Sequence, residues 1–462
     1  MSSNTDTTRR FFLGAATALA ATRVWGANDK INVALVGLGG RGTSHLNIYT
    51  RLPEAHLSAI CDIDQAAREK ANATILKNTG EKATEYDDMR KAFADPKIDA
   101  VSIATPNHWH ALAAIWAMKA GKDVYGEKPA CYNIYEGFKM AEVAHSTGKM
   151  MQVGSQHRST PFKMEAIAAL QGGLIGDIYL AKGMCYKRRA SIGHKEDSPV
   201  PPGVDWDMFL GPAPKRPFNA LRFKYNWHWF WDTGNGDIGN QGVHEMGIAR
   251  WGLADPKWPK TAVGTGGKYA YKDDQETPNT LLASFDYGGR ELVFEVRGLL
   301  TGADGVAVAR RGGAPAAGAV APPSDAPAPT STAPKAGPPL NVMVGDLFYG
   351  NNGWAAMSDA GFQAFKGESN ELIMDLRPQR GGDTTALHMQ NFLAACKSRK
   401  REDLHDGLDN AILSAGLCHL ANISYRSGRK LTLEGGTGVK FVNDSEANKM
   451  LTRPEYRKPY VV

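Results

Sequence analysis

Short apolar runs alternate with helix-forming stretches between residues 31 and 153. An apolar run without polar alternation is typical of a strand that is buried on both faces of a parallel sheet. The predicted strands are 31–36, 56–60, 99–104, 122–126 and 149–153, and the predicted helices are 43–49, 65–78, 86–93, 110–120 and 134–147. This alternation predicts a doubly wound parallel sheet, which binds its ligands at the carboxyl ends of its strands.

The pattern changes after residue 155. It predicts a helix at 160–172, strands at 177–186, 280–287, 291–297 and 341–349, a helix through 244–251, and amphipathic helices at 384–397 and 408–427. We expect these strands to form an open, mainly antiparallel sheet with helices on one side. Residues 301–340 are rich in Ala, Pro and Gly, and we expect a disordered insertion there. The predicted domains are an α/β domain at 28–154 and an α+β domain at 155–462.

Two adjacent arginines precede a small apolar run near the N-terminus. Arg9 and Arg10 are followed by Phe-Phe-Leu, by small residues at 14–21 and by Trp-Gly-Ala at 25–27. This order is typical of a twin-arginine export signal over residues 1–27, with a Sec signal as the alternative. We therefore expect the twin-arginine translocation machinery as a partner and a periplasmic or otherwise exported location.

Composition narrows the class of protein. Hydrophobic residues make up 42% of the chain, and no run after the predicted signal is long enough to span a membrane. The net charge of +6 is scattered and accompanies no recognition motif, so we expect no nucleic-acid partner. The five cysteines form no C-x-x-C pair, so we expect neither a disulfide framework nor a bound metal.

The first predicted strand ends in a glycine-rich turn. Gly37, Gly39 and Gly42 have the G-x-G-x-x-G spacing of a dinucleotide-binding unit. The first glycine of this motif allows a tight turn, and the second lets the backbone approach a pyrophosphate. The third lets the next helix lie on the strand, with its N-terminal amides facing the phosphates. The motif therefore predicts a bound dinucleotide.

The choice between NAD and NADP depends on the end of the second strand. Asp62 lies about 20 residues after Gly39, where an acidic residue binds the adenosine ribose hydroxyls. A carboxylate there repels a 2′-phosphate, which favours NAD. Arg41 and Arg68 lie nearby in sequence, so NADP stays open.

Two further motifs follow predicted strands of the first domain, and a third begins a helix of the second. They are Thr105-Pro106-Asn107 with His110, Glu127-Lys128-Pro129 after Ala120-Gly121-Lys122, and Gly242-Val243-His244. Together with the glycine turn, this ordered set resembles the Gfo/Idh/MocA oxidoreductases, the family of glucose-fructose oxidoreductase and inositol dehydrogenase.

The resemblance implies a substrate cleft between the two domains. In the family, the lysine of the E-K-P motif hydrogen-bonds the hydroxyl that is oxidised, which gives Lys128 a catalytic role here. The family histidine that accepts or donates the proton corresponds to His244. The residues expected to bind the cofactor are Gly37, Gly39, Gly40, Arg41, Gly42, Asp62, Thr105, Pro106, Asn107, His110, Glu127 and Lys128.

The chain departs from the family pattern beside this histidine. Many members have aspartate one helical turn before it, where this chain has Asn240, and Gly247 replaces another common aspartate. Asn240 can orient a substrate or the imidazole by hydrogen bonding, but it cannot accept a proton as a carboxylate does. Asp237 is a candidate for the missing carboxylate.

Aromatic and basic side chains gather between residues 187 and 231. Trp227, Trp229 and Trp231 alternate at the period of a strand, and they form either a core or dimer interface or a wall against a sugar ring. The basic run 187–189 either meets a polyhydroxylated or acidic substrate or lies in solvent. The residues expected at the substrate are His108, Trp109, Arg158, Trp229, Asp237 and Asn240.

These observations predict an exported NAD(P)-dependent oxidoreductase. It would transfer hydride between nicotinamide and a secondary alcohol of a sugar, sugar acid or cyclitol. Because a periplasm has no obvious nicotinamide pool, we expect a tightly bound cofactor that is regenerated in place.

Two other functions are compatible with the same residues. One is a glycoside hydrolase that works by transient oxidation and elimination without net redox change, as in NAD-dependent α-N-acetylgalactosaminidases. The other is a non-catalytic sugar-binding protein that keeps the fold. Because an open sheet face needs a cover, we also expect a homodimer or homotetramer formed through the second domain.

Overall fold

The computed structural model describes residues 29–299, 306–307, 340–379, 381–436 and 438–462. The predicted export signal at 1–27 lies outside these residues. So does the predicted insertion at 301–340, apart from 306–307 and 340. Within the described part of the chain, no helix has both the length and the apolar character needed to cross a membrane.

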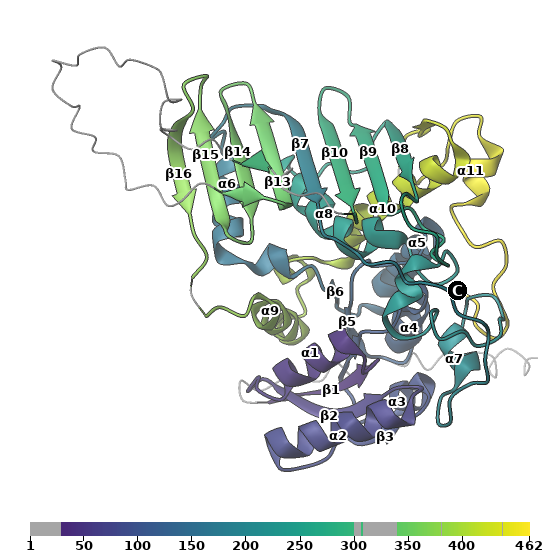
Figure 1. The fold of residues 1–462 in the computed structure, drawn as a ribbon. Coiled ribbons are helices and arrows are strands. Elements are labelled where there is room, and N and C mark those ends of the chain that lie inside the picture. The colour runs from purple at the N-terminus through teal and green to yellow at the C-terminus, as the bar shows by residue number, and fades with distance from the viewer. Residues whose placement is uncertain (1–28, 300–305, 308–339, 380, 437) are drawn as a thin grey trace, which may run out of the picture.

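The N-terminal domain is a parallel sheet with helices on both faces (Figure 1). Its strands have the order β3-β2-β1-β4-β5-β6, and the direction of winding reverses between β1 and β4. Ligands of such sheets bind at the carboxyl ends beside this reversal. The strands are β1 (Ile31–Val36), β2 (Ala55–Cys61), β3 (Thr84–Tyr86), β4 (Ala100–Ile103), β5 (Asp123–Gly126) and β6 (Met151–Val153). The helices are α1 (Gly40–Tyr49), α2 (Gln65–Thr79), α3 (Met89–Ala94), α4 (Asn107–Lys119) and α5 (Ile134–Thr147).

The parallel sheet confirms the predicted fold class, with one local difference. The predicted helix at 86–93 is present as α3 but begins at Met89, because Tyr86 ends the short strand β3, which was not predicted. Asp88 separates the two, because its side chain accepts a hydrogen bond from the Arg90 amide at 2.8 Å and so begins the helix.

The second domain is built on a nine-stranded sheet. Its order is β16-β15-β14-β13-β7-β10-β9-β8-β17, and its described neighbours are antiparallel except for the parallel pair β7 and β10. The strands are β7 (Ile178–Cys185), β8 (Thr261–Gly267), β9 (Thr280–Asp286), β10 (Glu291–Arg297), β13 (Val344–Gly350), β14 (Gly353–Ser358), β15 (Gly361–Lys366), β16 (Glu371–Leu376) and β17 (Leu431–Thr432). A separate ribbon pairs β11 (Val306–Ala307) with β12 (Asn341–Val342). This mainly antiparallel sheet also confirms the prediction.

Helices cover the inner face of the large sheet. Side chains on β10 alternate, so that Leu292, Phe294 and Val296 are fully buried in the core between sheet and helices. The covering helices are α6 (Pro161–Gln171), α8 (Val243–Gly252) and α10 (Leu408–Ser427), which lie behind the sheet in Figure 1. Helix α8 packs against β7, the central strand of this sheet.

The last third of the chain returns to the first domain. Helix α9 (Thr384–Ser398) places Met389, Phe392 and Leu393 in the core around α1 and β1, and it lies beside α1 in Figure 1. Helix α10 contributes Ile412 to the first domain's core and Leu417 to the second domain's core. The boundary at residue 154 therefore follows chain order, whereas packing joins both domains through α9 and α10.

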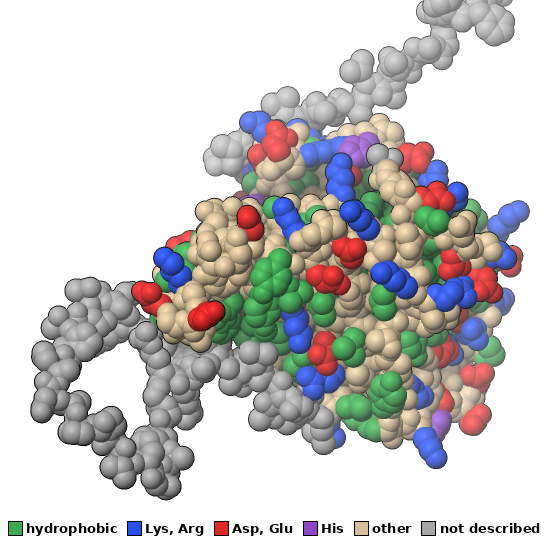
Figure 2. Space-filling view, turned by 90° about the horizontal axis from the view of Figure 1, so that it is seen from above, with side chains coloured by type: hydrophobic (Ala, Val, Ile, Leu, Met, Phe, Trp, Pro, Cys, Tyr) green, Lys and Arg blue, Asp and Glu red, His purple; other side chains and the backbone are tan. Residues whose placement is uncertain are grey.

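The remaining helical segments are short and connect these layers. They are η1 (Gln156–Ser159), α7 (Trp206–Leu210), η2 (Lys224–Trp229), η3 (Ile238–Gly242), η4 (Arg401–Asp403) and α11 (Ser445–Lys449). Figure 2 shows one face of the molecule, on which basic and acidic side chains are interspersed.

Two carboxyl groups lie in the core between α8 and the large sheet. Asp346 is fully buried, and neither of its carboxylate oxygens has a hydrogen-bond partner among the described residues. Glu245 is also buried, and its Oε1 accepts a hydrogen bond from Gln241 at 3.2 Å. Burial raises the pKa of Glu245 to about 8 and that of Asp346 well above its usual range. Both carboxyls are therefore protonated in the folded protein at neutral pH.

The pKa of Glu245 predicts a specific pH dependence of stability. An unfolded glutamate ionises near pH 4.5, whereas the folded one keeps its proton up to about pH 8, so the free energy of unfolding falls as pH rises between these values. Glu245→Gln removes this loss, and we expect its melting temperature at pH 8 to exceed that of the parent by about 3–6 °C. At pH 4.5 the two proteins should melt together. Equal melting temperatures at pH 8, or the same gain from the exposed Glu371→Gln, would contradict the assignment.

Candidate active site

The glycine turn after β1 forms an open cradle. Gly37 has a φ of +89°, and a Cβ there would lie 2.7 Å from the Ala104 carbonyl oxygen. A Cβ on Gly42 would lie 1.9 Å from the Gly37 carbonyl oxygen, so both positions require glycine. A Cβ on Gly39 or Gly40 would meet no described atom within 4 Å, and this free space lies at the start of α1. A pyrophosphate fits there against the first amides of the helix.

Asp62 follows β2 and faces the same cradle. Its Oδ2 accepts a hydrogen bond from the Leu38 amide at 2.6 Å, and its Oδ1 accepts one from the Asp64 amide at 2.9 Å. Burial raises the pKa of Asp62 although both amides oppose this. The guanidinium of Arg68 donates to the Asp62 carbonyl oxygen at 2.6 Å. An acid and an arginine thus lie together at the ribose position, and the geometry leaves NAD and NADP both possible.

One large cavity runs from this cradle to the second domain. Its volume is about 930 Å³, which is sufficient for a dinucleotide fragment and a small substrate. At one end it is lined by the glycine turn, Asp62 and nearby residues of α2 and the loop before it, namely Ile63, Asp64, Ala66, Ala67, Lys70 and Ala71. At the other end it is lined by Lys128, His110, Asn240 and His228. The cavity therefore joins the predicted cofactor site to side chains that can exchange protons.

Glu127 and Lys128 follow β5 at the centre of this cavity. The Glu127 carboxylate accepts hydrogen bonds from Arg41 Nε at 2.6 Å and from His45 Nε2 at 2.9 Å. Burial opposes its ionisation, but Arg41 and His45 outweigh burial and hold the pKa of Glu127 well below its usual range. Lys128 Nζ donates to the Asn240 carbonyl oxygen at 2.6 Å, and burial lowers the pKa of Lys128. The lysine is thus fixed between the two domains and is easier to deprotonate than a surface lysine.

The segment after β4 braces the same region. The ring nitrogens of His110 lie 2.7 Å from the Pro129 carbonyl oxygen and 2.9 Å from the Thr105 carbonyl oxygen, so this imidazole ties the ends of β4 and β5 together. Asn107 Nδ2 donates to Asn235 Oδ1 of the second domain at 2.8 Å. Pro106 lines the cavity beside Thr105, whose buried hydroxyl has no partner in the described residues.

His244 lies one turn of α8 beyond Asn240, and it is not among the residues that line the cavity. Its side chain is 9% exposed, and its ring packs perpendicular to His157 with 5.0 Å between centroids. Burial, followed by the charge of Lys128, holds the pKa of His244 well below its usual range. Its Nδ1 is buried without a partner in the described part of the chain. His244 is therefore a neutral imidazole close to Lys128, and its predicted role in proton transfer stays a prediction.

Asn240 and Trp109 line the cavity as expected for substrate residues, whereas others are engaged elsewhere. Asp237 is buried and forms an ion pair with Arg189 at 2.7 Å. Arg158 pairs with Asp255 at 2.6 Å, beneath α8. His108 and Trp229 are not among the lining residues. His108 Nε2 lies 2.8 Å from the Phe209 carbonyl oxygen, and the Arg189 guanidinium lies 5.6 Å from the centre of the Trp229 ring.

The aromatic cluster is the main point at which local sequence reasoning was wrong. The alternating tryptophans do not lie in a strand, because η2 turns this segment into a 3₁₀ helix. The turn brings Tyr225, Trp227 and His228 to the cavity and leaves Trp229 behind it. Met208 and Phe209 of α7 also line the cavity, although no motif marked them. The signal available in the sequence for this cavity wall was the combination of aromatic side chains with a histidine in residues 224–229.

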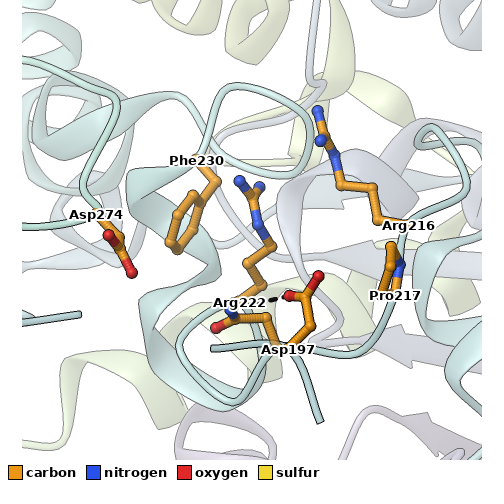
Figure 3. A pocket seen from close by; sticks show the side chains of 7 residues that line it. Asp197, Arg216, Pro217, Arg222, Phe230 and Asp274 are labelled. Carbon is orange, nitrogen blue, oxygen red and sulfur yellow. Dashed lines mark hydrogen bonds between the residues drawn. The ribbon is translucent and has the colours of Figure 1, made fainter. Parts of the chain in front are cut away.

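A second, smaller pocket lies on the long loop of the second domain (Figure 3). Its volume is about 180 Å³, and Asp197, Arg216, Arg222 and Asp274 line it. These charges already have partners: Arg222 donates to Glu276 at 2.7 Å, and Asp274 pairs with His194 at 2.6 Å. The groups available for chemistry are therefore those of the larger cavity.

This fold and site define a two-domain protein whose first domain has the Rossmann arrangement of a dinucleotide-binding unit. Residues 31–155 match the Gfo/Idh/MocA family described as "Oxidoreductase family, NAD-binding Rossmann fold". Residues 178–261 match the family's "C-terminal alpha/beta domain". By these two domains, the chain belongs to the Gfo/Idh/MocA oxidoreductases.

Curated relatives share part of the chain. A glycosyl hydrolase family 109 protein of Shewanella sp. (strain W3-18-1) is 36% identical over 125 residues, which cover 26% of this chain and 27% of that protein. An α-N-acetylgalactosaminidase of Shewanella oneidensis is 30% identical over 154 residues, which cover 32% of this chain and 34% of that protein. The alignments thus span about a quarter to a third of these relatives.

Solved structures share the fold over nearly the whole chain. A levoglucosan dehydrogenase with NADH and levoglucosan has a TM-score of 0.62 at 16% identity, covering 88% of this chain and all of that one. The WlbA dehydrogenase from Chromobacterium violaceum with NADH and UDP-GlcNAcA has a TM-score of 0.60 at 18% identity. The match covers 90% of this chain and 100% of that chain. At these identities the likeness shows the fold.

The open space at Gly39 gives a direct test of the cofactor site. The first side-chain atom of a valine there would contact no described atom, but the valine would occupy the space that a pyrophosphate needs. We expect Gly39→Val to fold, as judged by circular dichroism, and to carry at least tenfold less nicotinamide dinucleotide after purification. Gly438→Val is the matched control, because Gly438 also has open space around it but does not line the cavity. Full nucleotide content in Gly39→Val would place the dinucleotide elsewhere.

Proposed function

We propose that the protein oxidises or reduces a secondary alcohol of a sugar, sugar acid or cyclitol with a bound nicotinamide. The observation that carries this proposal is the position of Lys128. It lies in the same cavity as the glycine cradle, at the carboxyl end of β5, with its Nζ held 2.6 Å from the Asn240 carbonyl oxygen.

The described residues fit a nicotinamide dinucleotide. The cradle leaves room for a pyrophosphate, Asp62 is placed for ribose hydroxyls, and Arg41 Nη2 is buried without a partner among the described residues. Such a cofactor supplies the hydride chemistry when bound. The chain supplies the proton chemistry: Lys128 hydrogen-bonds the substrate hydroxyl, and its lowered pKa favours the neutral amine that can accept the hydroxyl proton. In the reverse direction the ammonium returns that proton to the carbonyl oxygen.

We further infer that the nicotinamide is resident. Residues 203–211, which we call the clamp, cross from the second domain to the ribose end of the cradle. The Gln65 amide donates to the Gly203 carbonyl oxygen at 2.9 Å, and the Asp205 amide donates to the Ile63 carbonyl oxygen at 3.0 Å. From the C-terminal segment, Arg457 bonds the Asp207 carboxylate at 2.6 Å and the Gly211 carbonyl oxygen at 3.0 Å. A dinucleotide beneath the clamp would leave only after these bonds open.

Export and assembly belong to the same proposal. An exported enzyme would benefit from a resident cofactor, because nicotinamide is not renewed by a surrounding pool. We also propose a homodimer or homotetramer formed through the large sheet, on which Leu282 of β9 is 42% exposed.

A redox-neutral glycoside hydrolase is the second candidate. It is favoured by one observation: the glycosyl hydrolase family 109 relatives match part of this chain at up to 36% identity. The same lysine and nicotinamide would then oxidise a sugar transiently, and reduction of the product would restore the cofactor.

Lys128→Met tests the proposed role of the lysine. Methionine keeps much of the side-chain volume but cannot exchange a proton, so the rate at which a hexose, hexuronic acid or inositol reduces the bound nicotinamide should fall about 10²- to 10⁴-fold. Nucleotide content should not change. The exposed Lys366→Met is the control and should match the parent rate. A near-normal rate in Lys128→Met would refute the assigned role.

Aryl glycosides separate the two candidates. We expect the purified holoenzyme to be reduced by at least one free sugar or cyclitol, seen in the near-ultraviolet absorbance of nicotinamide, and to leave 4-nitrophenyl glycosides intact. Release of nitrophenol without accumulation of reduced nicotinamide, abolished in Gly39→Val, would instead establish the glycoside hydrolase.

A further inference from the structure

An imidazole at the substrate end of the cavity takes no part in the reaction described above. His228 lies in η2 and lines the cavity together with Lys128 and Asn240. Its side chain is 9% exposed, so it faces an enclosed space instead of bulk water. A ligand that reaches Lys128 therefore passes close to this ring.

Hydrogen bonding fixes the tautomer of His228. Its Nδ1 lies 2.6 Å from the Tyr225 carbonyl oxygen, and a carbonyl oxygen can only accept, so Nδ1 carries the proton. The other nitrogen, Nε2, then holds a lone pair, and it makes no hydrogen bond with the described residues. The Trp227 ring stacks on the imidazole at 3.5 Å between centroids and an angle of 20°, which fixes the plane of the ring. Nε2 is thus a rigid hydrogen-bond acceptor.

The charge state supports the same role. Burial lowers the pKa of His228 to about 3, and the positive charges of Lys128 and Arg189 act in the same direction. The ring is therefore neutral at physiological pH and offers no second donor. A substrate hydroxyl can donate to Nε2, whereas a carboxylate or carbonyl at this point would face a lone pair.

We propose that His228 is a specificity-determining residue that accepts a hydrogen bond from a second hydroxyl of the substrate. This inference rests on the proposed function, in which Lys128 binds the hydroxyl that reacts. With a cationic or neutral amine on one hydroxyl and a fixed acceptor for another, the site selects a neutral polyhydroxylated ring. It disfavours simple alcohols, and it disfavours sugar acids whose carboxylate would lie against Nε2.

The test uses three substitutions of His228 in the holoenzyme. Gln places an acceptor oxygen near the position of Nε2, Asn is one methylene too short to do so, and Phe keeps a ring without an acceptor. The probes are D-glucose, D-glucuronate, myo-inositol and monodeoxy derivatives of whichever reduces the bound nicotinamide fastest. Measurements are KM and kcat for that reduction, with nucleotide content as the control for folding.

We expect His228→Asn and His228→Phe to raise KM about 10- to 100-fold with a much smaller change in kcat, and His228→Gln to stay close to the parent. With the parent enzyme, removal of one particular substrate hydroxyl should raise KM by the same factor. With His228→Phe, removal of that hydroxyl should not raise KM further, because each change removes one partner of a single hydrogen bond.

Three results would overturn the assignment. An unchanged KM in His228→Asn and His228→Phe would remove His228 from the substrate site while leaving the proposed function intact. If each monodeoxy derivative raised KM by the same factor in the parent and in His228→Phe, no substrate hydroxyl would be paired with this ring. Absence of reduction by all probes in the parent holoenzyme would contradict the proposed function itself, and this inference with it.

Discussion

The buried carboxylate of Glu127 is the constraint on which the arrangement of the site depends. It stays ionised in the interior because Arg41 of α1 and His45 of the same helix donate to it. An ionised group without such partners would cost several kcal/mol, so α1 and the end of β5 cannot separate. The glycine cradle at the start of α1 is thereby held against Lys128, the next residue along the chain. A structural ion pair thus positions the glycine turn, where we propose that the pyrophosphate binds, and the lysine that we propose exchanges a proton, relative to each other.

The second domain completes the site from the opposite side. The Asn240 carbonyl oxygen holds Lys128, Asn235 holds Asn107, and η2 supplies the ring wall and the imidazole of His228. Backbone hydrogen bonds join the clamp to Ile63 and Gln65, beside Asp62, so these contacts depend on the path of the chain and not on side-chain chemistry. The same enclosure that lowers the pKa of Lys128 would also retain the nucleotide.

Much of the first domain could be predicted because its signals are local. Buried strands are continuous apolar runs, and in a parallel sheet their carboxyl ends meet, so Gly37, Asp62 and Lys128 had to converge. The second domain's wall could not be predicted in this way. Trp227 and Trp229 alternate like strand residues, yet η2 forms a 3₁₀ turn there, and the clamp follows contacts with Ile63 and Arg457 that lie far away in sequence. Arg158 likewise has its partner, Asp255, in a distant loop.

The central claim is that a nicotinamide resides beneath the clamp and is cycled in place. The most direct measurement is the amount of dinucleotide released by denaturing protein that was purified without added cofactor. We predict one nicotinamide dinucleotide per chain. We also predict that this dinucleotide does not exchange with labelled nucleotide during turnover. Chains free of nucleotide, with hydride transfer that depends on added NAD or NADP, would contradict it.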